Sequence, residues 1–338
     1  MKEIDVLIEE MMALGASDMH LNHMAKVSYR IDGEMEQVGS RLGDIITGES
    51  IFEVMLPALT KGQQTTYLQT GTVDFAYELN GVRFRGSMIS SMDQPSCTMR
   101  IIPSKIIPIE ELKLPKAVID LFESPWGLLL VTGPTGSGKT TTLASGIDYI
   151  NRNRKVKIYT AEHPVEYVHQ NKKSIITQRE VPSDVGTFAR SMVDAMRNDP
   201  DVILVGEMRD HDTIGAAMTS AETGHLVMST LHTNTAPQTI YRILHEYPSS
   251  EHERIREQLA QSLRGVVSQR LFKNPKGGRT ATLEVMIVDD DIRELIRKNE
   301  IEKIYDVMRK KRDKGNILMT DSINMAKQRG TIQQNVKW

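Results

Sequence analysis

A glycine-rich octapeptide, GPTGSGKT, occupies residues 133–140 and constrains the fold of this chain more than any other feature. It follows the apolar run LLLV and precedes the segment TTLASGIDYI, which reads as a helix. The spacing and this strand–loop–helix context match the phosphate-binding loop pattern. Glycines permit backbone angles that point successive N–H groups at a phosphate, and the helix N-terminus adds partial positive charge. The sequence therefore predicts a nucleotide site on an α/β fold.

Each position of this loop has an expected role toward ATP. Lys139 would neutralise the β and γ phosphates, and Thr140 would ligate Mg²⁺. The whole segment is expected to contact the nucleotide: Gly133, Pro134, Thr135, Gly136, Ser137, Gly138, Lys139, Thr140 and Thr141. ATP and Mg²⁺ are therefore the predicted ligands.

The second part of the chain continues the same pattern. Apolar runs alternate there with helical segments, and the runs after the loop are VKIYT, DVILV and LVMST. Runs that are apolar throughout are typical of strands buried on both faces, so we expect a mostly parallel sheet in a domain spanning 115–338. A capping box at Ser250 to Glu253 predicts a further helix, whose apolar residues follow at four-residue steps: Ile255, Leu259, Leu263, Val267 and Leu271.

The first 100 residues have a different pattern. Apolar residues at helical spacing predict a helix from Glu3 to Leu14, which Gly15 would end. Short alternating runs with turn signals then predict an antiparallel sheet in a small α/β domain: VSYRID, VDFAYEL, VRFRGSMIS and CTMRII. Three prolines in IIPSKIIPIEELKLP predict a linker over 101–114, because proline lacks the N–H and fixes φ.

Composition excludes several classes of protein. No apolar stretch of the 338 residues is longer than a strand, and the acidic amphipathic start is unlike a secretory signal, so we expect a cytoplasmic protein. A single cysteine, Cys97, excludes an internal disulfide and a cysteine-based zinc site. The net charge of -2 lacks the basic footprint of a protein that binds nucleic acid.

Acidic and histidine residues follow the other predicted strands of the second domain. Because ligands sit at the carboxyl ends of strands in open α/β sheets, these side chains are expected near the phosphate loop. They are Glu162 and Glu166 after VKIYT, Glu207 after DVILV, and His232 after LVMST, with His225 at the start of that last strand. Each residue alone is more often a helix cap or a solvated group, but together they favour hydrolysis over nucleotide storage.

With these residues in view, the chain resembles the secretion ATPase superfamily, and within it the PilT-like retraction ATPases of type IV pili. Four blocks carry the resemblance: GPTGSGKT as Walker A, AEHPVEYVH as the Asp box, RNDPDVILVGEMRD as Walker B, and TGHLVMSTLHT as the His box. The spans ITQREV and SQRLF, and ASDMHL and YRIDGE in the first domain, also resemble the family.

The resemblance implies a hexameric ring of subunits with a small PAS-like N-terminal domain and a RecA-like ATPase domain. Glu166 matches the glutamate taken as general base, and Glu207 matches the Walker B glutamate, a metal-site residue. His225 and His232 match the His-box positions near the γ-phosphate. The family also supplies arginines to the nucleotide from the N-terminal domain, which here are Arg83, Arg85 and Arg100.

The family also implies the partners and two alternatives. A retraction ATPase acts on an inner-membrane platform protein of the pilus and meets the cytoplasmic membrane only through partners. The alternatives are a pilus-extension or type II secretion ATPase and a weakly hydrolysing accessory subunit; a DNA-translocating relative is disfavoured by the charge. The chain departs from the family at His163, where aspartate is common, and at DIRELI, residues 291–296, where AIRNLI is typical.

Overall fold

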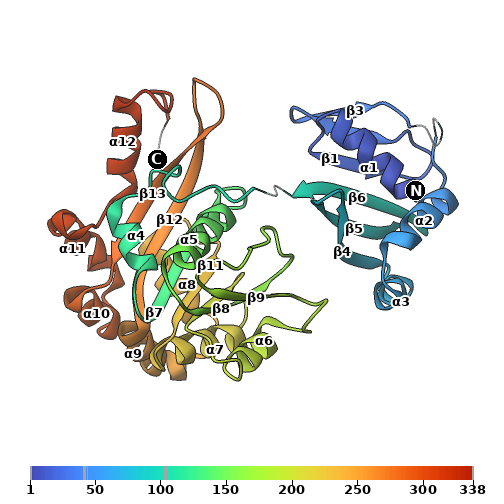
Figure 1. The fold of residues 1–338 in the computed structure, drawn as a ribbon. Coiled ribbons are helices and arrows are strands. Elements are labelled where there is room, and N and C mark those ends of the chain that lie inside the picture. The colour runs from blue at the N-terminus through green and yellow to red at the C-terminus, as the bar shows by residue number, and fades with distance from the viewer. Residues whose placement is uncertain (1, 41–42, 44, 103–104, 337–338) are drawn as a thin grey trace. The chain divides into compact units, whose positions relative to one another are not determined.

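The computed structural model describes residues 2–40, 43, 45–102 and 105–336, and its ribbon is drawn in Figure 1. Contacts divide the chain into two compact units, Met1–Lys105 and Ile106–Trp338. The predicted linker is shared between them. Strand β6 of the first unit runs to Ile102, whereas Ile109 is buried in the second unit and Ser145 Oγ donates a hydrogen bond to the carbonyl of Ile107.

The first unit is an antiparallel six-stranded sheet with helices, as predicted. Its strands have the order β3-β2-β1-β6-β5-β4. They are β1 Asp18–Leu21, β2 Ser28–Ile31, β3 Glu34–Gln37, β4 Thr72–Leu79, β5 Val82–Ser91 and β6 Gln94–Ile102. The helices are α1 Glu3–Ala13, α2 Gly48–Met55 and α3 Lys61–Thr70, with a short 3₁₀ turn, η1, at Leu56–Ala58.

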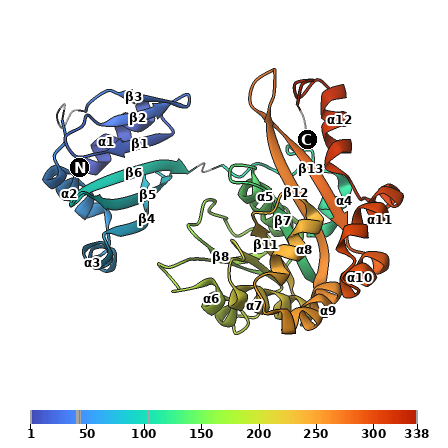
Figure 2. The same ribbon diagram turned by 180° about the vertical axis from the view of Figure 1, so that it is seen from behind.

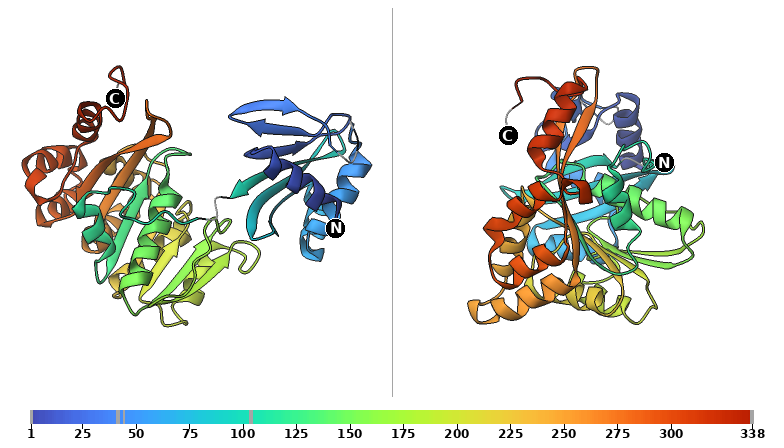
Figure 3. Two further views of the ribbon diagram at one scale, coloured as in Figure 1. Left: turned by 45° about the horizontal axis from the view of Figure 1, so that its top comes forward. Right: turned by 90° about the vertical axis from the view of Figure 1, so that its left-hand side faces the viewer.

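One face of this sheet packs on α1 and α2 and forms the core of the unit (Figure 3). Gly15 follows helix α1 with φ of 65°. Of the five apolar residues predicted at helical spacing in this helix, Met12 is half-buried and the others are buried: Ile4, Leu7, Ile8 and Met11. Cys97 of β6 lies in this core at 1% exposure, and burial raises the pKa of its thiol to about 12. Because burial disfavours the thiolate, this cysteine is an apolar core residue.

The second unit is built on a seven-stranded, mostly parallel sheet of order β13-β12-β7-β11-β10-β8-β9. Only the β12–β13 pair is antiparallel. The strands are β7 Gly127–Thr132, β8 Lys157–Glu162, β9 Ile175–Glu180, β10 Val202–Val205, β11 Leu226–Leu231, β12 Leu263–Lys273 and β13 Arg279–Ile287.

Helices cover both faces of this sheet (Figures 1 and 2). They are α4 Lys116–Phe122, α5 Lys139–Asn153, α6 Phe188–Ala195, α7 His211–Glu222, α8 Ala236–Leu244, α9 His252–Ser262, α10 Asp290–Arg297, α11 Ile304–Lys310 and α12 Met319–Gln328. Short 3₁₀ turns are η2 Ser249–Glu251, η3 Ile301–Lys303 and η4 Arg312–Lys314. No helix in the described part of the chain is both long and apolar enough to span a bilayer.

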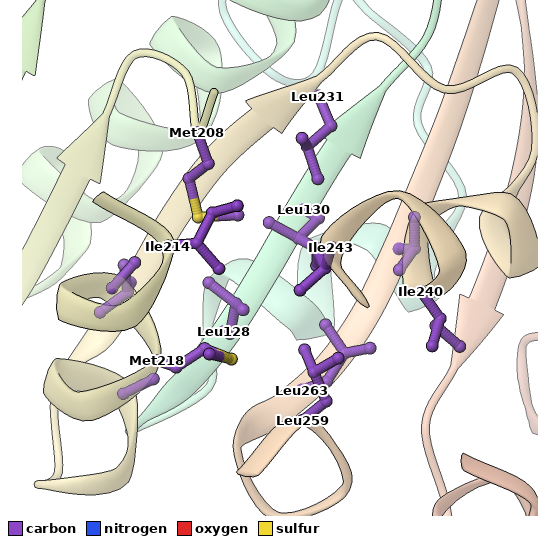
Figure 4. Packing of buried hydrophobic residues seen from close by; sticks show 14 of the residues in the cluster. Leu128, Leu130, Met208, Ile214, Met218, Leu231, Ile240, Ile243, Leu259 and Leu263 are labelled. Atoms are coloured by element: carbon purple, nitrogen blue, oxygen red, sulfur yellow. The ribbon is translucent and has the colours of Figure 1, made fainter. Parts of the chain in front are cut away.

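Strand β7 is buried on both faces, which explains its continuous apolar sequence. Leu128 and Leu130 pack with α7, α8 and α9, and Figure 4 shows them beside residues of these helices. Leu129 and Val131 point to the other face, where they share a cluster with residues of α4 and α5. Alternate residues of a strand face opposite sides of a sheet, so every side chain of β7 is enclosed.

The helix predicted from residue 250 is wrong beyond Ser262. Helix α9 ends there, and Leu263, Val267 and Leu271 lie in β12. The predicted capping box is not formed either, because the N-cap of α9 is Glu251 and makes no side-chain cap bond. A step of four residues keeps side chains on one face of a helix but also on one face of a strand, so this spacing could not separate the two.

Candidate nucleotide-binding site

The phosphate loop joins β7 to α5, and three glycines give it a curved backbone. Gly133, Gly136 and Gly138 have φ of 142°, 76° and 88°, values that side-chain-bearing residues rarely adopt. Space is also limited at two of them. A Cβ at Gly133 would lie 2.3 Å from the backbone oxygen of Gln269, and a Cβ at Gly138 would lie 2.7 Å from Nε2 of the Gln269 side chain. Glycine is therefore required here by conformation and by packing.

The loop is open on one side and lined with polar groups. Pro134, Thr135 and Gly136 are exposed, whereas Ser137 is 3% exposed. The buried Oγ of Ser137 has no hydrogen-bond partner among the residues that the structure describes. A buried hydroxyl without a partner is unusual, and an anion bound in the loop would supply an acceptor for it. The residues present therefore fit a phosphate group.

Lys139 is the first residue of α5 and lies 9% exposed under the loop. Its Nζ donates hydrogen bonds to the carbonyl oxygens of Gly133 at 2.9 Å and Pro134 at 3.1 Å. Burial lowers the pKa of Lys139, and the nearby carboxylates of Glu207 and Glu166 oppose that shift. The ammonium group thus lies within the electrostatic reach of both glutamates.

Glu207 comes directly after β10 and Gly206, at the same edge of the sheet as the loop. Its Oε2 lies 2.7 Å from Nε of Arg209 and 3.7 Å from Nε2 of His232. His232 follows β11, the strand between β10 and β7. Burial lowers the pKa of His232, Lys139 and Arg209 lower it further, and Glu207 opposes the shift. The structure therefore brings Lys139, Glu207 and His232 together.

Glu162 and Glu166 lie in the segment that follows β8. Glu162 is the last residue of β8 and is 8% exposed, and it accepts hydrogen bonds from Thr160 Oγ1 at 2.7 Å and Gln178 Nε2 at 3.1 Å. Glu166 is half-buried, and its charge acts on Lys139. The charge of Glu166 thus reaches Lys139 of the phosphate loop, and two hydrogen bonds hold the buried carboxylate of Glu162 at the end of β8.

Tyr167 fixes this acidic segment to the helix that carries the loop lysine. Its hydroxyl shares a hydrogen bond of 3.0 Å with Oγ1 of Thr141 in the first turn of α5, and its backbone oxygen accepts from Gln178 Nε2 at 2.9 Å. The side chain is 6% exposed. Because Tyr167 is next to Glu166 in sequence, this contact positions Glu166 relative to Lys139.

The structure does not bring His225 to this edge. His225 precedes β11, and the register pairs Leu226 with Gly127 and Leu231 with Thr132, at opposite ends of β7. A strand of this length spans about 17 Å. The ring Nδ1 of His225 lies 2.9 Å from the carbonyl of Ser220 instead. His225 therefore lies at the far end of the strand from the phosphate loop of its own chain.

The three arginines of the first unit lie on neighbouring strands of its sheet. Arg83 and Arg85 are two residues apart on β5, and Arg85 pairs in register with Arg100 of β6, so all three share the face opposite the core. Arg85 pairs with Asp74 at 3.5 Å. Arg100 Nε lies 2.5 Å from Oδ1 of Asp18, a carboxylate that is only 2% exposed.

Sequence analysis missed three residues of the site. Arg209 lies two residues after Glu207, inside the RNDPDVILVGEMRD block, and Tyr167 lies inside AEHPVEYVH, so both were within recognised segments. Gln269 lies in SQRLF, more than a hundred residues from the loop that it contacts. In the sequence, only the resemblance of that segment to the family indicated that it matters.

No group of three or more histidine, cysteine, aspartate or glutamate side chains within the described residues could hold a metal ion. Mg²⁺ keeps several waters and is usually held by one or two protein groups together with substrate phosphates, so a nucleotide-dependent site needs no such group. Thr140 in the first turn of α5 and Glu207 near Lys139 carry oxygen atoms of the kind that Mg²⁺ prefers.

Three comparisons place the chain among known proteins. Residues 1–337 match the family model described as type II/IV secretion system protein. A twitching motility protein of Neisseria gonorrhoeae is 43% identical over 305 residues, which are 90% of this chain and 81% of that protein. A type IV pilus retraction ATPase, PilT, of Pseudomonas aeruginosa is 40% identical over 292 residues, or 86% and 84% of the two chains.

Among solved structures, the chain is similar to the pilus retraction motor PilT with bound ADP. The TM-score is 0.90 with 39% sequence identity, and the match covers 99% of this chain and 95% of that chain. Both units of the fold described above are thus contained in the similarity.

Proposed function

The chain belongs to the type II/IV secretion system protein family, and from that premise we propose that it is an ATP-hydrolysing motor that powers retraction of a type IV pilus. The relative from Pseudomonas aeruginosa is named a retraction ATPase, and the similar solved structure is a pilus retraction motor with bound ADP. The observation that carries the proposal is the gathering of Lys139, Glu207 and His232 at one sheet edge beside the phosphate loop. Fixed charges at such an edge suit phosphoryl transfer, where positioning and electrostatic stabilisation dominate.

Each residue of the edge has a task in this proposal. Lys139 balances the negative charge of the β and γ phosphates of ATP, and Glu166 accepts the proton of the attacking water. Glu207 and Thr140 would hold Mg²⁺, which would neutralise phosphate charge when bound. His232, whose pKa is lowered by burial, can donate a hydrogen bond from its ring toward the γ-phosphate. The loop from Gly133 to Thr141 binds the phosphates.

We further propose that the subunits form a hexameric ring. The three arginines Arg83, Arg85 and Arg100 belong to a different unit from the phosphate loop, so we propose that they act on the nucleotide of a neighbouring subunit. His225 lies far from the loop of its own chain, and we propose no catalytic role for it there. The ring is proposed to act on a platform protein at the inner face of the cytoplasmic membrane.

Phosphate release by purified protein tests the enzymatic part. Glu166→Gln and Glu207→Gln should bind ATP as wild type does but hydrolyse it at least about tenfold more slowly. The first variant loses the proton acceptor for the attacking water and the second loses a charge for Mg²⁺, while the phosphate contacts of the loop remain. Wild-type turnover in either variant would remove that glutamate from the proposed mechanism. A matched control is Glu302→Gln, a change at an exposed residue of the η3 turn, which should not change turnover.

Electron microscopy of cells that lack the gene tests the cellular part. Hyperpiliated cells without twitching motility would support retraction. Bald cells would contradict it and indicate extension instead.

A further inference from the structure

Gln269 lies where β12 leaves the central sheet. The pairing of β12 with β7 ends at Ser268 opposite Thr132, and from Gln269 onward β12 pairs only with β13. The residue is 4% exposed and lies against the phosphate loop, as the close approach of its backbone oxygen to Gly133 shows.

Both ends of the Gln269 side-chain amide bond the loop and its helix. Nε2 donates to the carbonyl oxygen of Ser137 at 2.7 Å, and Oε1 accepts from Oγ1 of Thr142 at 2.8 Å. A backbone carbonyl can only accept, so the contact with Ser137 fixes which end of the amide is the NH₂ group. One buried side chain thus connects the loop, the first turn of α5 and β12.

The contact with Ser137 sets the direction of one peptide group. In a trans peptide the C=O and the following N–H point in opposite directions. Because the Ser137 oxygen is held toward Gln269, the N–H of Gly138 faces away from β12. A loop that binds phosphate needs its N–H groups turned toward the anion, and a carbonyl turned there would repel it.

We propose that Gln269 is a positioning residue of the phosphate loop, which holds the Ser137–Gly138 peptide in the orientation that binds phosphate. The inference rests on the proposed nucleotide function and adds to it a residue from outside the four recognised motif blocks. It also explains why Gly133 and Gly138 need to lack side chains, since both lie against Gln269.

Gln269→Glu is the sharpest test, because it keeps the size of the side chain and the acceptor for Thr142 but removes the donor to Ser137. A carboxylate would face the Ser137 carbonyl and add a negative charge under the phosphate site. We expect the Kd of a fluorescent ADP analogue, measured without Mg²⁺, to rise about tenfold or more. The KM for ATP should rise in parallel, with kcat at saturation within about threefold of wild type.

Gln333→Glu is the matched control, since Gln333 is exposed and far from the loop in sequence. It should bind ADP as wild type does. An unchanged Kd in Gln269→Glu, with the protein folded, would overturn the proposal; so would a loss of kcat without any change of Kd or KM.

A second pair of variants keeps the test valid if Gln269→Glu does not fold. Thr142→Val removes the hydroxyl that holds Oε1, and Thr142→Ser keeps it. We expect the Kd of ADP to rise about threefold in Thr142→Val and to stay at the wild-type value in Thr142→Ser. Equal Kd values in these two variants would also overturn the proposal. Wild-type protein that binds ADP yet does not retract pili would contradict the proposed function but not this inference.

Discussion

The carboxylate of Glu207 lies 2.7 Å from the guanidinium Nε of Arg209, two residues further along the chain. Arg209 is mostly exposed, whereas Glu207 is largely buried, so the arginine holds the carboxylate from its solvent side. We predict that Arg209→Ala lowers kcat about threefold to tenfold with little change of KM, because Glu207 loses its fixed orientation. Steady-state phosphate release checks this, and Arg209→Lys should recover part of the rate. A kcat of wild-type size in Arg209→Ala would show that Glu207 is positioned by other contacts.

Lys139→Ala should abolish tight nucleotide binding, because it removes a charge-assisted contact to the phosphates. The same change should not lower the melting temperature measured without nucleotide. Burial lowers the pKa of Lys139, which means that the folded protein disfavours this charge. ADP titration and thermal unfolding check the two parts, with exposed Lys173→Ala as the control. Nucleotide binding at wild-type strength would contradict the assignment of the loop.

A mixture of two inactive variants tests whether the arginines act between subunits. Arg100→Ala and Lys139→Ala subunits should each lack ATPase activity alone and recover part of it when mixed, because each supplies what the other lacks. Asp18→Asn is the informative control, since it removes the ion pair with Arg100 but keeps the arginine. Mixed rings without any recovery, at a ratio where both subunits are present in each ring, would contradict action in trans.

His169 should make the second unit less stable in weak acid. Its side chain is largely buried, and burial lowers its pKa from 6.5 to about 4. The unfolded chain therefore binds a proton at a higher pH than the folded chain does, so the free energy of unfolding falls as pH drops from 6.5 toward 4. Between pH 7 and pH 5 the loss should be about 2 kcal/mol.

Urea unfolding of wild type and His169→Gln at these two pH values measures this loss. Trp126 lies in the second unit, so its fluorescence reports the unfolding of that unit. The pH dependence should be smaller in His169→Gln by about 2 kcal/mol. Equal pH dependence in the two proteins would show that His169 is protonated with similar ease in the folded and unfolded chains.

Arg293→Glu should separate ATP hydrolysis from pilus retraction. In α10 the apolar residues Ile292 and Ile296 are fully buried, and Arg293 lies outside that face with Nη1 bonded to Asp290 at 2.7 Å. We predict a folded protein with ATPase activity within about threefold of wild type and no retraction in cells, because the change replaces a charge that lies outside the apolar face of the DIRELI segment. Phosphate release and twitching assays check the two outcomes. A parallel loss of both would show that the segment is needed for folding or hydrolysis.

Local patterns were enough to predict the phosphate loop and the two kinds of sheet. A glycine-rich loop between strand and helix is a local feature, and continuous apolar runs distinguish buried parallel strands from alternating ones. Strands β1 and β3 and helices α2 and α3 of the first unit were not predicted. Strand β3 is exposed at all four residues, and α3 buries only Tyr67, so neither has the apolar periodicity on which prediction depends.

Contacts between segments far apart in the sequence could not be predicted from local patterns. Gln269 and Ser137 are 132 residues apart, and their contact depends on the pairing of β12 with β7. That pairing was not predicted, because the residues of β12 were predicted to continue a helix. His225 shows the complementary limit. The His-box pattern groups it with His232, but six residues of β11 separate the two and place them at opposite ends of a strand.

The buried thiol of Cys97 makes the chain a convenient subject for site-specific labelling. A thiol with a pKa of about 12 and almost no exposure reacts slowly with maleimides at neutral pH. The wild-type protein is therefore expected to remain unlabelled by such reagents. New cysteines at exposed positions, such as Met92 in the first unit and Lys276 in the second, would then be the only fast-reacting sites. A donor and an acceptor fluorophore at these two positions would measure whether the distance between the two units changes when ATP is added.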